Sequence, residues 1–158
     1  MAGSGLILPM LTIEFPAPNF RTRKRQGAQE EEEIFDPIRK KWLLLTPEEW
    51  VRQNFVAWLV KVGGIPPSLI GLERGVAVGE LKKRFDIVVF KNDGRPWMLV
   101  ECKAMTVPLS ENTVAQTLAY LSGMACPYAI ITNGRHTFGW QMQGQNVQEL
   151  AVFPKYSS

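Results

Sequence analysis

Residues 85–103 read Phe-Asp-Ile-Val-Val-Phe-Lys-Asn-Asp-Gly-Arg-Pro-Trp-Met-Leu-Val-Glu-Cys-Lys, which is two apolar runs joined by a turn. The β-branched residues of both runs are typical of strands, and the Asp-Gly pair favours a tight hairpin turn. Both runs are nearly continuously apolar, as in strands that are covered on both faces. The stretch therefore predicts an antiparallel hairpin at the centre of a layered domain.

The predicted hairpin brings charged side chains together on one face. With the Asp-Gly pair as the two central turn residues, Asp86 lies directly opposite Glu101, and Lys103 shares the face of Glu101. The same register places Arg84 beside Lys103. A three-residue loop would shift the register by one and weaken this placement.

Two carboxylates held this close repel each other unless a cation intervenes. Mg²⁺ prefers oxygen ligands and often takes one or two carboxylates together with waters and a substrate phosphate. A neighbouring lysine can orient or deprotonate water, or stabilise charge on a phosphorane. These residues indicate metal-assisted phosphodiester hydrolysis. The alternative is a surface ladder of ion pairs among Asp86, Glu101, Arg84 and Lys103.

Outward from the hairpin, the pattern predicts a helix over residues 47–62, with Thr46 as N-cap and Glu49 completing a capping box. A second helix is expected from Glu111 to about residue 125, capped by Ser110. Further strands are expected at residues 69–78, 128–132, 137–142 and 147–153. This order predicts an α/β domain, a mixed sheet flanked by helices.

The chain has 158 residues and a net charge of +3, which fits one domain and argues neither for nor against nucleic-acid binding. We expect residues 1–34 to form an N-terminal extension, either a solvated segment or a charged hairpin, and residues 35–158 to form the domain. The two separated cysteines predict reduced thiols in a cytoplasmic protein rather than a zinc site. No membrane span, secretory signal or P-loop is recognisable.

Several motifs resemble those of known nucleases. Arg84-Phe85-Asp86 followed by Val100-Glu101-Cys102-Lys103 resembles the PD-(D/E)xK signature, with Phe85 where the signature has Pro. Gln116-Thr117-Leu118-Ala119-Tyr120 resembles the Q-x-x-x-Y helix motif of the RecB-like branch. From Ile34-Phe35-Asp36-Pro37 through Leu45-Thr46-Pro47-Glu48-Glu49-Trp50 to Ile131-Thr132-Asn133-Gly134, the chain looks like the type I restriction enzyme R-subunit N-terminal domain family. It is most similar to the small stand-alone members, over roughly residues 10–145.

This resemblance implies a restriction-endonuclease-like fold with an αβββαβ core and a DNA endonuclease that uses Mg²⁺ or Mn²⁺. It implies two metal-binding acids, one main-chain carbonyl ligand, one catalytic lysine and two helix residues that line the site. These positions are, in that order, Asp86 and Glu101, the carbonyl of Cys102, Lys103, and Gln116 with Tyr120. ATP-driven translocation does not carry over, because the motor of full-length R subunits has no counterpart in these residues.

Sites of this family often add a glutamate from the first helix, and three residues are candidates. At about 100° per residue, Glu48 lies close to the apolar stripe of the helix, whereas Glu49 lies far from it. We therefore favour Glu48 and interpret Glu49 as the capping-box residue, although helix ends are uncertain enough to leave both open. Glu73, on the preceding strand, is a third candidate.

DNA is the expected partner, and Arg84 and Lys83 are the expected phosphate contacts. A motor or specificity protein is a further candidate partner, because so small a chain has little room for choosing a target. The rival hypotheses are a non-cleaving DNA-binding or adaptor module of the same fold, and a nuclease subunit that is active only with a partner.

Overall fold

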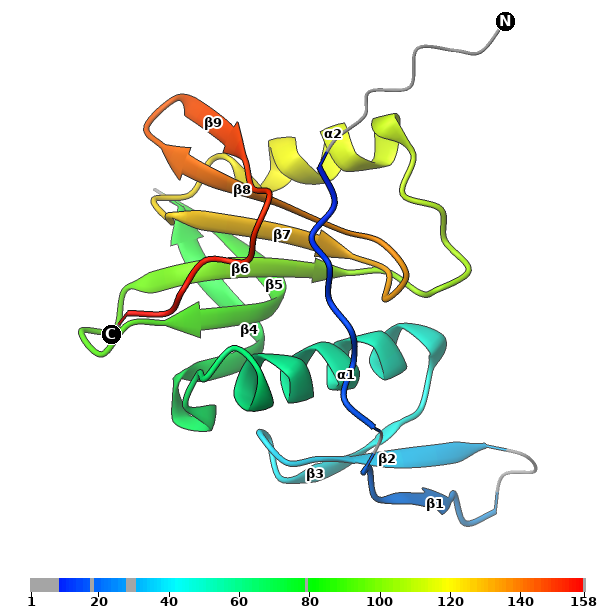
Figure 1. The fold of residues 1–158 in the computed structure, drawn as a ribbon. Helices are drawn as coiled ribbons and strands as arrows, with labels where there is room; N and C mark the ends of the chain where they lie inside the picture. The colour runs from blue at the N-terminus through cyan, green and yellow to red at the C-terminus, as the bar shows by residue number, and fades with distance from the viewer. Residues whose placement is uncertain (1–8, 18, 28–30, 79, 158) are drawn as a thin grey trace, which may run out of the picture.

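The computed structural model describes residues 9–17, 19–27, 31–78 and 80–157. Within these residues, the main body is a six-stranded sheet in which the strands follow one another in sequence order. All neighbouring strands are antiparallel except the sixth and seventh of the chain, which run parallel. The strands, drawn in Figure 1, are β4 (Ile70–Val78), β5 (Leu81–Phe90), β6 (Pro96–Cys102), β7 (Tyr128–Thr132), β8 (Thr137–Gln143) and β9 (Asn146–Glu149).

One helix covers each face of this sheet. Helix α1 (Pro47–Lys61) lies on one side and helix α2 (Glu111–Leu121) on the other (Figure 1). Ile87 and Val89 of β5 pack in the core cluster that contains α1 residues, whereas Val88 packs in a cluster with Leu121 of α2. Successive strand residues thus point to opposite layers, which explains why the strand reads as a continuous apolar run.

The order α1, three strands, α2 and a parallel strand is the αβββαβ arrangement that the sequence predicts. Helix α1 begins at Pro47 as expected and ends at Lys61, one residue early. Helix α2 ends at Leu121 rather than near residue 125, because Gly123 and Pro127 disfavour continuation. A short 3₁₀ turn, η1 (Pro67–Leu69), leads into β4.

The last expected strand is also shorter than predicted. Strand β9 ends at Glu149, where the pattern had indicated a strand over residues 147–153. The chain then crosses to the α1 side of the sheet, where Leu150, Phe153 and Tyr156 pack against the core. Figure 1 shows this segment running from β9 towards the β5–β6 turn, and the Tyr156 hydroxyl donates to the Phe90 carbonyl oxygen at 2.9 Å.

The N-terminal region contains a second, three-stranded antiparallel sheet below α1 in Figure 1. Its first two strands form a hairpin in which a basic arm faces an acidic arm, with Arg23 paired to Glu33 and Arg25 to Glu31, each at 3.0 Å. This is the charged hairpin, one of the two expected forms of the extension, although the expected boundary at residue 34 falls inside the second strand. Glu30 lies outside the described residues. The strands are β1 (Thr22–Lys24), β2 (Glu32–Asp36) and β3 (Lys41–Leu44).

The β5–β6 turn differs from the prediction, yet the predicted register is found beyond it. The Gly94 N–H donates to the Lys91 carbonyl and the Lys91 N–H to the Arg95 carbonyl, and Gly94 has a φ of +86°, so the loop is one residue longer than expected. A longer loop shifts the register by one, and Phe90 accordingly pairs with Pro96. An irregularity between Val89 and Phe90 then shifts it back.

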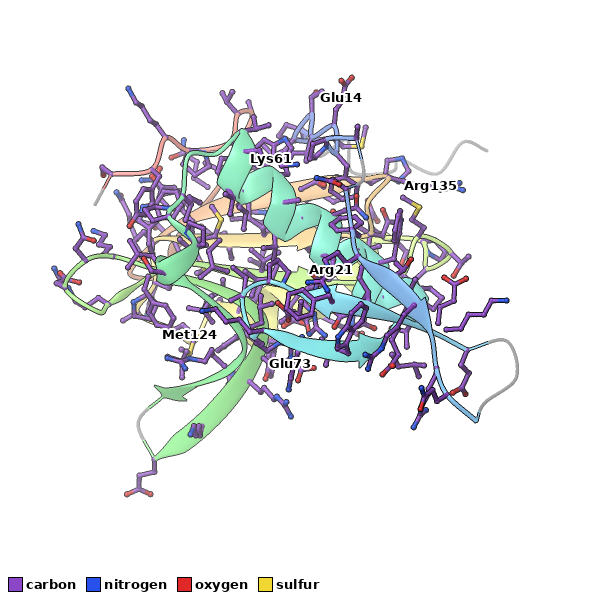
Figure 2. The ribbon with its side chains drawn as sticks, turned by 90° about the horizontal axis from the view of Figure 1, so that it is seen from below. Glu14, Arg21, Lys61, Glu73, Met124 and Arg135 are labelled. Atoms are coloured by element: carbon purple, nitrogen blue, oxygen red, sulfur yellow. The ribbon has the colours of Figure 1, made fainter. Side chains whose placement is uncertain are left out.

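Because the two shifts cancel, the register beyond the irregularity is the predicted one, with Val89 opposite Met98, Val88 opposite Leu99, and Ile87 opposite Val100. The two-residue turn was therefore wrong and the register right. The far end of the β4–β5 hairpin projects away from the rest of the molecule, as Figure 2 shows from below. The described part of the chain contains no helix long and apolar enough to span a membrane.

Candidate active site

Asp86 marks a break in the regular structure of β5. Phe85 and Ile87 are two residues apart but pack in clusters on opposite sides of the sheet, so the alternation of side chains is interrupted at Asp86. The Asp86 carboxylate Oδ2 accepts the backbone N–H of Cys102 at 2.7 Å. The predicted regular ladder pair between Asp86 and Glu101 is therefore replaced by a side-chain contact between the same two strands.

The carboxyl groups of Asp86 and Glu101 are close enough to perturb each other. Burial raises the pKa of Glu101 to about 7, and the negative charge of Asp86 adds to the shift. Burial also raises the pKa of Asp86, although the N–H of Cys102 and the charges of Arg52 and Lys103 oppose the shift. Ionising both carboxyl groups at once in this partly desolvated place therefore costs free energy.

Lys103 and Glu48 belong to the same electrostatic neighbourhood. Lys103 is the first residue after β6. Its charge opposes the rise in pKa at Asp86, Glu101 and Glu48, although all three pKa values stay raised overall. Burial raises the pKa of Glu48, in the first turn of α1, and the charge of Asp86 is the next cause. The fold therefore brings together Asp86, Glu101, Lys103 and Glu48 from three elements.

The Glu49 side chain does not close the capping box that the sequence predicts. The N-cap is as predicted, since the Glu49 N–H donates to the Thr46 hydroxyl oxygen at 3.0 Å. The Glu49 carboxylate is buried, however, and accepts hydrogen bonds from Arg39 at 3.2 Å and from Arg52 instead of closing a capping box. The N–H of Thr46 donates to the Leu44 carbonyl oxygen, so the reciprocal half of the predicted capping box is absent.

Glu73 lies on β4 between the pairs Leu72–Ile87 and Arg74–Phe85, which places it beside Asp86. Its φ of +51° is in the left-handed region, an uncommon and strained conformation for a residue with a side chain. Burial raises the pKa of Glu73, but Arg52, Arg84 and Arg39 outweigh this effect and lower it overall. Glu73 is thus an ion-pair centre at the edge of the site, unlike Asp86, Glu101 and Glu48, whose pKa values are raised.

Arg52 and Arg39 form ion pairs at the site that the sequence does not reveal. Arg52 Nη1 lies 3.2 Å from Glu73 and 3.8 Å from Asp86 Oδ1, and its side chain is only 11% exposed. Arg39 pairs with Glu49, Glu73 and the fully buried Asp36. The i,i+3 spacings of Asp36 with Arg39 and of Glu49 with Arg52 are visible in the sequence, but such spacings are common on exposed surfaces and do not reveal burial.

Tyr120 reaches β5, while Gln116 stays exposed one turn earlier on α2. The Tyr120 hydroxyl donates to the Arg84 carbonyl oxygen at 3.1 Å, and Lys83 Nζ donates to the Tyr120 carbonyl oxygen at 2.9 Å. Lys83 also lies over the Tyr120 ring. Arg84 points the other way, with Nη2 at 2.7 Å from Glu73. Arg84 thus lies at Glu73 on the edge of the site, Lys83 lies against α2, and each is already engaged with a neighbour.

A cavity of about 590 Å³ opens beside the acids. It is bordered by the first turns of α1, by β3 and by Glu73, and its lining residues include Glu48, Glu49 and Arg52. Ala104, the residue after Lys103, also lines the cavity.

A hard divalent cation fits the donor set at Asp86 and Glu101. Burial raises the pKa of both carboxyl groups, and the charge of Asp86 adds to the shift at Glu101, so a cation between them would favour their ionised forms; Mg²⁺ is commonly held by one or two carboxylates with waters. In the described residues, no group of three or more His, Cys, Asp or Glu side chains forms a metal site. A set of two side chains and one main-chain carbonyl does not require such a group.

The Cys102 side chain is not part of this chemistry. It is buried on the α1 side of the sheet. Burial and the negative charge of Asp86 raise the pKa of the Cys102 thiol well above its ordinary value, so the thiolate that nucleophilic catalysis needs is not formed.

A mixed α/β domain with clustered acids and a lysine beside its central hairpin is what nucleases of the restriction-endonuclease type present. The model of the family described as the type I restriction enzyme R protein N terminus matches residues 47–154, and the chain belongs to this family. The match begins at α1 and includes every residue of the αβββαβ core.

A solved structure of a candidate nuclease of the DUF820 family from Anabaena variabilis resembles the chain with a TM-score of 0.46 and 13% sequence identity. The resemblance covers 82% of this chain and 79% of that one. No curated protein matches the sequence.

Proposed function

We propose that the chain hydrolyses DNA phosphodiester bonds with Mg²⁺ or Mn²⁺ held by Asp86 and Glu101. The observation that carries the proposal is the meeting of Asp86 and Glu101 beside Lys103, where the Cys102 N–H holds Asp86 Oδ2 at 2.7 Å and burial raises the pKa of both acids. Two desolvated carboxylates contribute little to stability, so a fold that keeps them together has a use for a cation there. Membership of the restriction enzyme R protein N-terminal family supports the same assignment.

The roles follow from the position of each group. Asp86, Glu101 and the main-chain carbonyl of Cys102 would hold the cation, with Glu48 as an additional acid. When bound, the metal ion would supply Lewis-acid polarisation of a phosphate oxygen. Lys103 would orient the attacking water and stabilise the charge that develops on phosphorus. The hydrogen bond from the Cys102 N–H to Asp86 holds that carboxylate in place.

Substrate contacts would come from β5 and α2. Arg84 lies against Glu73 and Lys83 against Tyr120, and guanidinium and ammonium groups bind phosphate. For Arg84 this requires the guanidinium to leave Glu73. Tyr120 and Gln116 would line the substrate side, with the Tyr120 hydroxyl fixing the backbone of β5 at Arg84.

A nicking assay with supercoiled plasmid and Mg²⁺ or Mn²⁺ tests the proposal. K103A and D86N should each lower the cleavage rate at least about a hundredfold, the usual range for a lost general acid–base or electrostatic group. Asn at position 86 keeps an oxygen acceptor for the Cys102 N–H, so the fold should be preserved. K91A, which removes a lysine from the β5–β6 turn, is the matched control and should cleave like the wild type. Wild-type cleavage by K103A would refute the assignment.

Dependence on a partner is a second candidate, and one observation favours it. Basic side chains that could bind DNA are paired with acids: Arg84 with Glu73, Arg23 with Glu33, and Arg25 with Glu31. Intramolecular pairing weakens the phosphate contacts that dominate DNA affinity. Fluorescence anisotropy with labelled duplex DNA should then show weak, salt-sensitive binding, and a motor or specificity protein would supply the missing affinity. Tight binding at 150 mM salt by the chain alone, on the order of 10⁻⁸ M, would remove the need for a partner.

A non-cleaving DNA-binding or adaptor module remains the rival of another class. Such a module would need no cation at Asp86 and Glu101. Titration of Mn²⁺ into wild-type protein and D86N separates the two, because only the nuclease reading predicts a site that the substitution removes.

A further inference from the structure

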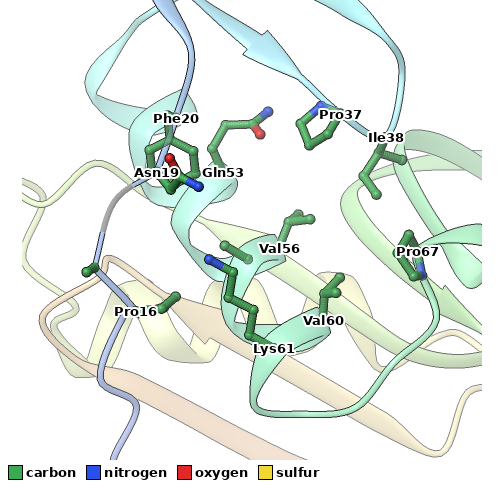
Figure 3. A pocket seen from close by; sticks show the side chains of 12 residues that line it. Pro16, Asn19, Phe20, Pro37, Ile38, Gln53, Val56, Val60, Lys61 and Pro67 are labelled. Carbon is green, nitrogen blue, oxygen red and sulfur yellow. The ribbon is translucent and has the colours of Figure 1, made fainter.

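A second cavity lies on the outer side of α1, away from the acids. It has a volume of about 410 Å³, within the usual size of a small-molecule site. Its walls come from the N-terminal segment, from the turn after β2, from α1 and from the chain just before β4 (Figure 3). Most lining residues are apolar, among them Pro16, Phe20, Ile38, Val56, Val60 and Pro67.

The walls of this cavity are held by packing. Phe20 stacks edge-on against Trp50 of α1 with ring centroids 5.5 Å apart. Ile38 packs against the α1-side core, and Val56 is itself a buried member of that core. A wall fixed in this way keeps the cavity open without a ligand, which reduces the free energy that binding must supply.

Gln53 gives the cavity a polar floor that the fold leaves unsatisfied. Its side chain is 1% exposed, and among the described residues the carboxamide nitrogen Nε2 has no hydrogen-bond partner. Figure 3 shows the carboxamide pointing between Phe20 and Pro37. Leaving a buried donor unpaired costs free energy, and a ligand atom that accepts the bond would remove the cost.

The charge around the cavity selects the ligand. Lys61 extends from the last turn of α1 back towards Asn19 (Figure 3), so an ammonium group and an amide border the opening. None of the described lining residues is acidic. Donors at the floor and a cation at the rim favour a ligand with acceptor oxygens and a negative charge, and the apolar walls favour a ring system or branched aliphatic body.

We propose that this cavity binds a small carboxylate with an apolar body of about two rings, with an oxygen accepting from Gln53 or Lys61. An engineered cavity of about 150 Å³ holds benzene, so the present volume suits a two-ring molecule. The site is independent of phosphodiester hydrolysis, because Asp86 and Glu101 contribute nothing to it.

The test uses 1-naphthylacetate as the probe and 1-naphthylacetamide as its neutral match, in the full chain without added metal. The side-chain NH₂ signals of Gln53 in ¹H–¹⁵N NMR spectra should shift saturably with the acid, with a Kd of about 1 mM or tighter for a ligand of this size. K61M should weaken the acid at least about threefold and leave the amide unchanged, since it removes one charge–charge contact at an exposed rim.

Q53L removes the donor while keeping a side chain of similar size, and, with binding followed by the backbone N–H signals of α1, it should weaken the acid about fivefold or more without lowering Tm. A57F, which places a ring into the cavity, should abolish binding even if Q53L folds poorly. K91M, at the β5–β6 turn, is the matched control for K61M. The proposal is overturned if the Gln53 signals stay still up to about 5 mM probe. It is equally overturned if the acid binds K61M and Q53L as tightly as the wild type, or if A57F binds it as before.

Discussion

Replacing Glu101 by Gln should stabilise the metal-free protein at alkaline pH. Glu101 is partly buried, and burial together with the charge of Asp86 raises its pKa from the ordinary 4.5 to about 7. Because the folded state holds the proton more tightly than the unfolded state, ionisation of this group above pH 7 works against folding. Gln keeps the shape and an acceptor oxygen but carries no charge, so the repulsion with Asp86 disappears.

The size of the effect follows from the two pKa values. A change from 4.5 to about 7 corresponds to an upper limit of about 3 kcal/mol at pH 8. The carboxylate retains some contact with solvent, and screening reduces the value, so we expect about 1–2 kcal/mol, or a Tm increase of about 2–8 °C. The sign follows from linkage: the penalty is absent below the unfolded pKa of 4.5, grows as the pH rises, and is complete above about 7.

Thermal unfolding followed by circular dichroism, with EDTA present, measures this directly at pH 5 and pH 8. E101Q should exceed the wild type in Tm at pH 8 and match it closely at pH 5. E149Q is the control, because Glu149 is exposed on β9 and loses the same charge. Added Mg²⁺ at pH 8 should raise the Tm of the wild type and leave that of E101Q unchanged, because ligands stabilise only the state that binds them.

Ionised Glu101 does not destabilise the folded state if the Tm of E101Q is no higher than that of the wild type at pH 8, or if its gain in Tm is equally large at pH 5. The first result would mean that Glu101 is paired in solution and is not repelled. The second would mean that the gain comes from packing and not from charge.

Three further outcomes follow from the same contacts. R52M should destabilise the protein by about 2–3 kcal/mol in urea unfolding, because the buried Glu49 keeps only Arg39 as a partner; a loss below about 0.5 kcal/mol would contradict the pairing. D86A should be less stable than D86N by about 1 kcal/mol in the same assay, since Ala leaves the Cys102 N–H unpaired; equal stabilities would exclude the Asp86 hydrogen bond. Y120F should cost at most about 1 kcal/mol and reduce plasmid nicking less than K103A, because its hydroxyl binds the β5 backbone; a loss as deep as that of K103A would place it on the substrate.

The central hairpin and the order of elements could be predicted from sequence because they rest on local signals. Apolar runs, an Asp-Gly turn and the Thr46 N-cap each act within a few residues, and the structure has the strands and helix they indicate. The predicted register at Ile87 is correct, but not because of a two-residue turn. The turn is one residue longer, and the irregularity between Val89 and Phe90 reverses the register shift that this causes. No local rule reveals the second of these, because it depends on how the twisted strands pair.

The rest of the site depends on contacts between residues far apart in the chain. The sequence suggests that Glu48 and Glu49 differ in direction, but not that Glu49 is buried between two arginines. The left-handed backbone of Glu73 has no signal in its neighbours, because a non-glycine residue adopts it only under tertiary constraint. Gln53 likewise reads as an ordinary polar helix residue, and only the packing of the N-terminal segment over α1 encloses it.

The most direct test of the central claim is calorimetric titration of Mn²⁺ into wild-type protein, D86N and E101Q at pH 8. The wild type should bind Mn²⁺ saturably, and both variants should lose that binding while all three proteins stay folded by circular dichroism. For the wild type, binding should weaken as the pH falls below about 7, because Glu101 must lose its proton to take the cation. If D86N and E101Q bound Mn²⁺ as tightly as the wild type, Asp86 and Glu101 would not form the metal site.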